Sequence, residues 1–165
     1  MLRTYHTARL AFGFLILALA ACNRGSTPEL VNHRAPEFTV RDSDRAVALR
    51  DFRGKVVILN FWATWCPPCV EEMPALSAMQ EQLRERVNVL AVSVDQDADA
   101  YRRFLEEHKI KLLTVRDAEQ KSNRLYGTSK YPETYIIDRT GIVRRKFIGP
   151  VQWTSPEILD YLRNL

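Results

Sequence analysis

Hydrophobic residues along this chain follow two different periods, and the two periods meet between residues 56 and 83. Val56 to Phe61 is a run of apolar, strand-favouring residues interrupted only by Asn60. Such a run predicts a strand that is buried on both faces of a sheet. From residue 70 the apolar positions recur three or four residues apart, which predicts a helix with one buried face. They are Val70, Met73, Leu76, Met79 and Leu83.

The rest of the chain continues this alternation of strands and helices. Residues 87–94 predict a second buried strand, 97–108 an amphipathic helix, 112–115 a short strand and 119–126 a helical turn with Leu125 and Tyr126 inward. A strand, a helix and a further strand in succession predict a right-handed crossover and a parallel pair. Residues 134–138 and 141–148 predict a hairpin, as do residues 36–40 and 46–49 near the start.

The last helix has a clear start signal. Ser155 is a good N-cap residue, and Pro156 suits the first helical position. The apolar residues that follow would dock this helix on the sheet; they are Ile158, Leu159, Leu162 and Leu165. The whole pattern predicts an α/β fold with a central mixed sheet and helices on both faces.

A Cys-x-x-Cys motif, Cys66-Pro67-Pro68-Cys69, lies where the central strand passes into its helix. The free amides and dipole of a helix N-terminus favour negative charge, so they stabilise the thiolate that attacks disulfides. Two cysteines at this spacing can also form a disulfide with each other. The alternatives are an inert structural disulfide and half of a zinc site. Zinc needs about four ligands, but the chain has no second Cys pair and its histidines show no paired spacing. Redox chemistry is therefore the favoured interpretation.

The first residues have the properties of an export signal. Arg3, His6 and Arg9 precede a run from Leu10 to Ala21 that is apolar apart from one glycine. This run is shorter than the roughly 20 residues that span a bilayer, but it fits the apolar region of a signal peptide. Small residues before Cys22 resemble the bacterial lipobox, in which the cysteine is lipidated.

An ordinary signal peptide beside a chance cysteine is the alternative to a lipobox. Lipidation would account for the third cysteine, which has no partner once Cys66 and Cys69 are paired. We therefore expect residues 1–21 to be a signal peptide, residues 22–35 a lipidated tether and residues 36–165 one domain.

Charge excludes some functions. The 24 basic and 20 acidic residues lose only Arg3 and Arg9 with the signal, which leaves a net charge of +2. Such a balance predicts no nucleic-acid partner. No metal or other cofactor is expected, and we expect a monomer.

The segment from Gly54 to Cys69, followed by Glu72-Met73-Pro74, resembles the thioredoxin superfamily. Within it, the chain is most similar to the membrane-anchored TlpA/ResA/CcmG-like thiol-disulfide oxidoreductases of bacterial envelopes. The resemblance runs from about Ala35 to Leu165. It implies a thioredoxin-like fold with an N-terminal β-hairpin and an insertion in the middle of the core.

The resemblance also implies roles for residues around the motif. Cys66 would be the attacking thiol and Cys69 the more buried, resolving thiol. Asn60 stands where thioredoxin has a buried aspartate that moves a proton, and an asparagine cannot titrate. Glu72 lies one turn beyond Cys69 and is the expected substitute, with a pKa raised by burial. The alternative for Glu72 is an ordinary surface position.

A second segment completes the expected site. Lys130 to Asp138 resembles the strand start that carries the cis-proline of the superfamily, so Tyr131–Pro132 would be cis and face the cysteines. The backbone of Tyr131 could then pair with an extended substrate. Trp65 and Glu133 are further candidates for substrate contact, although Trp65 could equally be a packed loop residue.

These expectations predict a disulfide reductase of envelope proteins, lipid-anchored on the periplasmic side and, in a Gram-negative source, on the outer membrane. Typical family substrates are apocytochrome c and copper-site assembly proteins, and a membrane thiol carrier usually supplies electrons. With proline at both spacer positions and no cation in the motif, we expect a reduction potential nearer thioredoxin's roughly −270 mV than DsbA's roughly −120 mV.

Other functions remain as alternatives or are excluded by the motif. A disulfide oxidase or isomerase is one alternative. A copper-binding assembly chaperone that carries the metal on the Cys pair, with Met73 and Met79 as further soft ligands, is another. Peroxiredoxins carry Pro-x-x-x-Thr-x-x-Cys, but Leu59 and Ala63 stand at those positions here, which argues against a peroxidase.

Overall fold

A five-stranded mixed sheet forms the centre of the molecule, in the order β5-β4-β3-β6-β7. The computed structural model describes residues 29–43 and 45–165. The strands are β3 (Val56–Trp62), β4 (Val87–Ser93), β5 (Leu113–Arg116), β6 (Glu133–Ile137) and β7 (Val143–Ile148). β3, β4 and β5 are mutually parallel, whereas β6 runs antiparallel to both of its neighbours. The predicted mixed sheet and parallel crossover are therefore confirmed.

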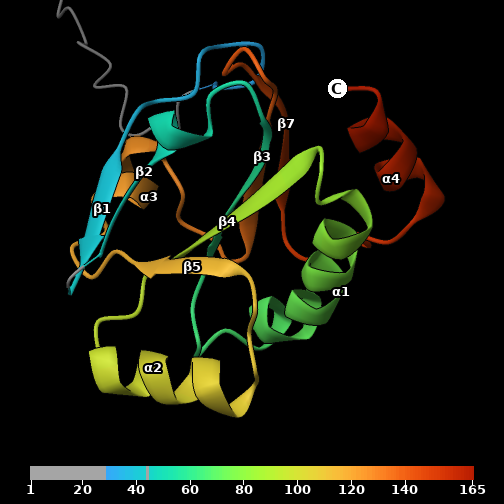
Figure 1. Ribbon diagram of the computed structural model, residues 1–165. Coiled ribbons are helices and arrows are strands. Elements are labelled where there is room, and N and C mark those ends of the chain that lie inside the picture. Colours follow the sequence, from blue (N-terminus) through green and yellow to red (C-terminus); the bar gives the residue numbers. More distant parts are fainter. Residues whose placement is uncertain (1–28, 44) are drawn as a thin grey trace, which may run out of the picture.

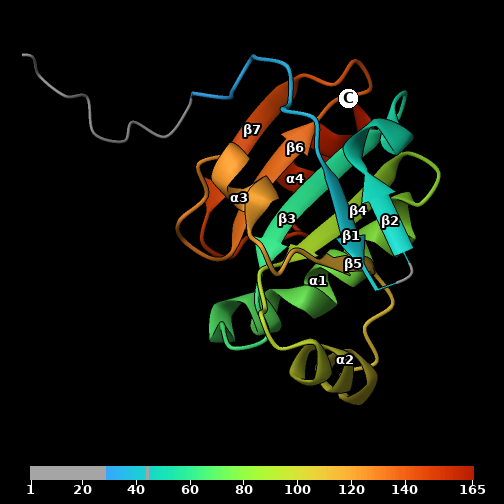
Figure 2. The same ribbon diagram turned by 90° about the vertical axis from the view of Figure 1, so that its left-hand side faces the viewer.

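Helices and a hairpin cover the two faces of this sheet (Figures 1 and 2). α1 (Pro67–Leu83) and α4 (Pro156–Arg163) pack on one face. The other face is covered by the hairpin of β1 (Thr39–Asp42) and β2 (Arg45–Ala48), a 3-10 turn at Leu49–Phe52, and α3 (Lys121–Leu125). α2 (Ala98–Glu107) joins β4 to β5 on the α1 side.

Strand β3 separates two apolar cores because its alternate side chains point to opposite faces. Val56, Ile58 and Trp62 face α1, whereas Val57, Leu59 and Phe61 face the hairpin and α3. Every residue of β3 is buried. This double burial explains why the strand reads as a continuous apolar run in the sequence.

Local signals account for where the helices begin. The Asp97 side chain accepts hydrogen bonds from the backbone amides of Asp99 and Ala100 and so caps α2. Ser155 caps α4 in the same way, through the amide of Ile158, and Pro156 occupies its first turn as the sequence predicted. These bonds satisfy helix amides that would otherwise have no partner.

Two details of the sequence interpretation were wrong. Leu125, expected to point inward with Tyr126, is 45% exposed, and only Tyr126 is buried. The first strand begins at Thr39 rather than at Pro36. Pro36 has no amide proton to contribute to a strand ladder, and its carbonyl instead accepts a hydrogen bond from the hydroxyl of Tyr126.

The segment before the hairpin is packed onto the domain. Leu30 and Ala35 are buried, and the backbones of Asn32 and Ala35 donate hydrogen bonds to Val143 and Gly141 in the β6–β7 region. This contact lies at the end of the sheet where β3 begins, since Val57 pairs with Ile137. The chain therefore enters the domain at the end opposite to Cys66. No helix within the described ranges is long and apolar enough to cross a membrane.

A buried carboxylate stabilises the turn between β6 and β7. Asp138 accepts hydrogen bonds from the amides of Thr140 and Ile142 and from the hydroxyl of Thr140, and it pairs with Arg144 at 2.6 Å. Burial alone would raise its pKa, but these donors outweigh burial and lower the pKa of Asp138 to about 2.

We expect D138N to lower the free energy of unfolding by about 2 kcal/mol at neutral pH. A depressed folded-state pKa stabilises the fold above the unfolded value near 4, and that stabilisation is lost as the pH falls through the folded value near 2. The difference between wild type and D138N in urea unfolding should therefore shrink between about pH 4 and pH 2. A difference that stays constant down to pH 2 would contradict this account.

Candidate redox active site

Cys66 and Cys69 form a disulfide at the start of α1, with their Cα atoms 5.3 Å apart. Cys66 is the N-cap residue of the helix and is 6% exposed, whereas Cys69 is fully buried in the first turn. The more accessible sulfur therefore belongs to Cys66. This order agrees with an attacking Cys66 and a resolving Cys69.

The first turn of α1 offers few donors to a negative charge. Pro67 and Pro68 have no amide proton, and the amides of Cys69 and Val70 both donate to the carbonyl of Cys66. A Cys66 thiolate would therefore gain less from this helix N-terminus than a thiolate usually does.

Glu72 lies one turn beyond Cys69 on the buried face of the helix and is only 4% exposed. Its Oε1 atom accepts a hydrogen bond of 2.8 Å from Nδ2 of Asn60. Its Oε2 atom accepts from the amide of Val151 at 3.1 Å and from the indole nitrogen of Trp153 at 3.2 Å. Three neutral donors from two other parts of the chain thus hold this carboxyl group.

Burial raises the pKa of Glu72 above its ordinary value, although the hydrogen bonds from Val151, Trp153 and Asn60 oppose the shift. A carboxyl group whose pKa has moved toward neutrality can take up and release a proton under physiological conditions. Glu72 therefore has the burial and the pKa direction that proton exchange with Cys69 requires.

Asn60 has a role that the sequence did not reveal. Besides Glu72, its amide nitrogen donates to the hydroxyl of Thr134 on β6 at 2.9 Å, while its oxygen has no partner among the described residues. A buried acceptor without a donor costs about 1–3 kcal/mol. The asparagine that cannot titrate is thus the residue that positions the titratable Glu72. Val151 and Trp153 were also missed, since no sequence period links them to the motif.

Aromatic residues from two loops meet beside the disulfide. Trp65, directly before Cys66, is 62% exposed, and its ring stacks edge-on against Tyr131 with centroids 6.0 Å apart. The Tyr131–Pro132 bond is cis, as the sequence predicted. Asn123 donates a 2.7 Å hydrogen bond to the hydroxyl of Tyr131 and so orients its ring. The backbone amide and carbonyl of Tyr131 make no backbone hydrogen bond within the described part of the chain.

Glu133 follows Pro132, but the structure does not bring it together with Glu72. Its neighbour Thr134 faces Asn60, so Glu133 points to the opposite face of the sheet. There its buried carboxylate pairs with Lys146 at 2.9 Å and accepts a hydrogen bond from Thr128 at 3.0 Å. The expected substrate contact by Glu133 remains a prediction, and in this structure its side chain is occupied internally.

The structure describes two of the three other residues that the sequence singled out. Met73 and Met79, the soft ligands of the copper alternative, are buried in the apolar core beneath α1. Core packing therefore accounts for both. Cys22, the expected lipidation site, lies outside the described residues.

Comparison with known proteins agrees with this site. Residues 31–146 match the AhpC/TSA family. A thiol-disulfide oxidoreductase ResA from Bacillus thuringiensis (strain Al Hakam) is 32% identical over 137 residues, which cover 82% of this chain and 78% of that protein. The thioredoxin-like protein YneN of Bacillus subtilis (strain 168) is 34% identical over 120 residues, or 70% of each chain. The chain belongs to the AhpC/TSA family, as a ResA-like thiol-disulfide oxidoreductase.

Solved structures support the same assignment. A Chlorobium tepidum protein described as a thiol:disulfide interchange protein DsbE is 30% identical, with a TM-score of 0.69 over 79% of this chain and 91% of that one. The exposed lipoprotein thioredoxin Etrx1 of Streptococcus pneumoniae strain TIGR4 is 26% identical, with a TM-score of 0.68 over 79% of this chain and 100% of that one. The thioredoxin-like fold and the activity of a protein-disulfide oxidoreductase follow from these relatives and from the Cys66–Cys69 pair.

For this ResA-like protein we expect E72Q to change how stability depends on pH. A raised folded-state pKa means that the folded protein binds the Glu72 proton more tightly than the unfolded chain does. Wild-type stability should therefore fall as the pH rises from the unfolded value near 4.3 through the folded value. E72Q has no ionisable group at this position and so does not lose this stability. Over this pH range the free energy of unfolding of E72Q should therefore rise relative to that of the wild type.

Chemical denaturation of both proteins between pH 4 and pH 8 measures the effect. The exposed neighbour Glu71 provides a matched control, and E71Q should follow the wild type. A difference between E72Q and wild type that is independent of pH would show that burial does not raise the pKa of Glu72.

Proposed function

We propose that this oxidoreductase is a lipid-anchored reductase of protein disulfides in the bacterial cell envelope, acting on the periplasmic side. The observation that carries the proposal is the Cys66–Cys69 pair at the start of α1, with Glu72 buried one turn further along the helix.

The reaction begins with the reduced dithiol. The thiolate of Cys66 attacks one sulfur of the substrate disulfide, and the new bond joins Cys66 to the substrate. The other substrate sulfur leaves with the electron pair of the broken bond and takes up a proton. Cys66 suits this step because it is the more accessible cysteine and lies at the helix start.

Cys69 completes the reaction. Its thiolate attacks the sulfur of Cys66, the Cys66–Cys69 disulfide forms, and the second substrate cysteine is released. The substrate has then gained two electrons and two protons. Because Cys69 is fully buried, its proton cannot pass directly to water, and Glu72 on the same helix face is the group that accepts it.

The substrate would bind across the loop that carries the cis-proline. The free backbone groups of Tyr131 can pair with an extended chain, as in β-strand addition. Trp65 and the ring of Tyr131 offer an exposed aromatic edge beside the disulfide. Glu133 borders this loop from the other face of the sheet and supports it through Lys146 and Thr128.

Two observations favour reduction over oxidation. The double proline leaves no free amide in the first turn to stabilise a Cys66 thiolate, and Glu72 brings a buried carboxyl group close to the pair. Strong oxidants of this superfamily are oxidising because their reduced form is stabilised. A less stable thiolate makes the dithiol easier to oxidise, so the protein acts as a reductant.

The export signal and one relative support the anchor, and the partners proposed here are those typical of the family. Lipidation at Cys22 is supported by the lipobox-like sequence and by the lipoprotein relative of Streptococcus pneumoniae. Since residues 30–35 pack at the end of the sheet opposite to Cys66, an anchored domain would direct its disulfide away from the membrane. Apocytochrome c or copper-site assembly proteins would be substrates, a membrane thiol carrier the electron donor, and the outer membrane the site in a Gram-negative cell.

We expect the Cys66–Cys69 couple to have a reduction potential below about −240 mV, in the range of dedicated reductants. The full-length protein in detergent would be equilibrated with glutathione or dithiothreitol buffers, and the oxidised fraction of the peptide that carries both cysteines would be measured by mass spectrometry. C69S, which cannot form the disulfide, is the control for side reactions. A potential above about −160 mV would contradict a reductase and indicate an oxidase or isomerase.

We also expect the wild-type protein, expressed in a bacterium, to be found in the membrane fraction with its new N-terminus at an acylated Cys22. C22S should lose the acyl chains and leave the detergent phase, because a single uncleaved apolar run of this length anchors weakly. Intact-mass measurement and detergent phase separation test both points. A wild-type protein with an unmodified Cys22 would contradict the anchor without affecting the redox proposal.

A further inference from the structure

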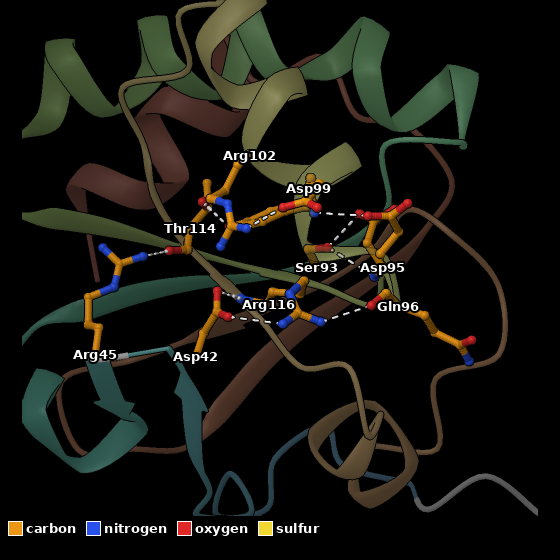
Figure 3. Close-up of polar contacts among 11 residues, drawn as sticks. Asp42, Arg45, Ser93, Asp95, Gln96, Asp99, Arg102, Thr114 and Arg116 are labelled. Carbon is orange, nitrogen blue, oxygen red and sulfur yellow. Dashed lines mark hydrogen bonds and ion pairs between the residues drawn. The ribbon is translucent and has the colours of Figure 1, made fainter.

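A second buried carboxylate lies next to the redox loop, at the end of β4. Asp95 is 3% exposed. Its Oδ1 atom accepts a hydrogen bond of 2.7 Å from the hydroxyl of Thr64. Its Oδ2 atom accepts from the amide of Thr64 at 3.0 Å and from the hydroxyl of Ser93 at 2.6 Å. Figure 3 shows Ser93 and Asp95 at this strand end.

The register of the sheet explains this position. Trp62 pairs with Ser93 in the parallel ladder of β3 and β4, and the amide of Val94 donates to the carbonyl of Trp62. Both strands therefore end at the same level, and the residues that follow each strand lie next to each other. Thr64 is two residues before Cys66. Its hydrogen bonds to Asp95 therefore hold the loop that leads to the attacking cysteine against the end of β4.

No cation compensates this carboxylate among the described residues. Arg116, opposite Ser93 on β5, is directed to Asp42 and to the carbonyl of Gln96 instead, as Figure 3 shows. Other charged groups on the adjoining elements have partners of their own: Arg45 of the hairpin binds the carbonyl of Thr114, Asp97 caps α2 and Asp99 pairs with Arg102. Asp117, whose amide donates to the carbonyl of Ser93, accepts from Ser122, and Arg103 of α2 is exposed. On α1, the buried Glu72 adds a further carboxyl group.

A buried negative charge disfavours a second negative charge nearby. We propose that Asp95 is a positioning residue that fixes the redox loop through Thr64, and that its uncompensated charge disfavours the Cys66 thiolate and so keeps the protein strongly reducing. This inference deepens the proposed function and depends on its reductive direction.

The test is D95N in the full-length protein. Asparagine retains an acceptor for the amide of Thr64 but removes the charge. The reduced form should become more stable, so the exchange equilibrium with glutathione should shift at least threefold toward the dithiol, about 14 mV at ~30 mV per tenfold. The pH at which Cys66 is alkylated at half its maximal rate by iodoacetamide should fall in parallel, because the thiolate reacts.

D138N is a matched control. Asp138 is also a buried carboxylate that accepts bonds from a backbone amide and a threonine hydroxyl, but it lies at the opposite end of the sheet. D138N should retain the wild-type exchange equilibrium and alkylation profile. D95A, which loses both the charge and the tie to Thr64, should show the shift of D95N and, in addition, slower exchange at equal thiolate fraction.

An equilibrium and an alkylation profile of D95N identical to those of the wild type would overturn the charge effect. Equal exchange rates for D95A and D95N would overturn the positioning role. If D95N does not fold, D95S provides the same test with a small neutral acceptor. Neither measurement needs a substrate protein. A wild type that fails to reduce protein disulfides would therefore refute the proposed function as a result distinct from these two.

Discussion

The buried carboxyl group of Glu72 is the interaction on which the active site depends. A carboxyl group placed among apolar side chains without donors would cost several kcal/mol, so the surrounding elements have to supply them. Asn60 comes from the central strand, and Val151 and Trp153 come from the segment between β7 and α4. One side chain, one helical turn beyond Cys69, thus fixes α1, β3 and the C-terminal segment relative to each other.

The groups around the cysteines also affect how stable a thiolate is at this site. Ordinary helix N-termini stabilise a thiolate through free amides, but Pro67 and Pro68 have none. Glu72 lies on the helix side of the pair. On the β4 side, Asp95 holds the loop through donors that are all neutral in the described part of the chain. In the proposed reductive function, the missing amides and the Asp95 carboxylate would each make the Cys66 thiolate less stable. A protein that donates electrons needs this balance, because its dithiol must be easier to oxidise than the substrate's.

The sequence predicted the parts of the site that follow a period or a motif. The run from Val56 to Trp62 and the Cys-x-x-Cys after it required a buried strand followed by a helix, and a spacing of three placed Glu72 beside Cys69. The partners of Glu72 could not be predicted, because Val151 and Trp153 are about 80 residues away and meet it only through tertiary packing. Leu125 was misplaced because it ends a helix of five residues, too short for a period to define its buried face.

The alternation of side chains along β6 explains why Glu133 and Glu72 have different surroundings. Glu133 and Thr134 are adjacent, so only one of them can face Asn60, and the hydrogen bond from Asn60 assigns that face to Thr134. Glu133 pairs with Lys146 on the other face, whereas all donors to Glu72 among the described residues are neutral. The carboxylate of Glu133 is therefore engaged by a cation inside the protein. Glu72 forms no ion pair among the described residues and burial raises its pKa, which is why we propose Glu72 as the group that exchanges protons with Cys69.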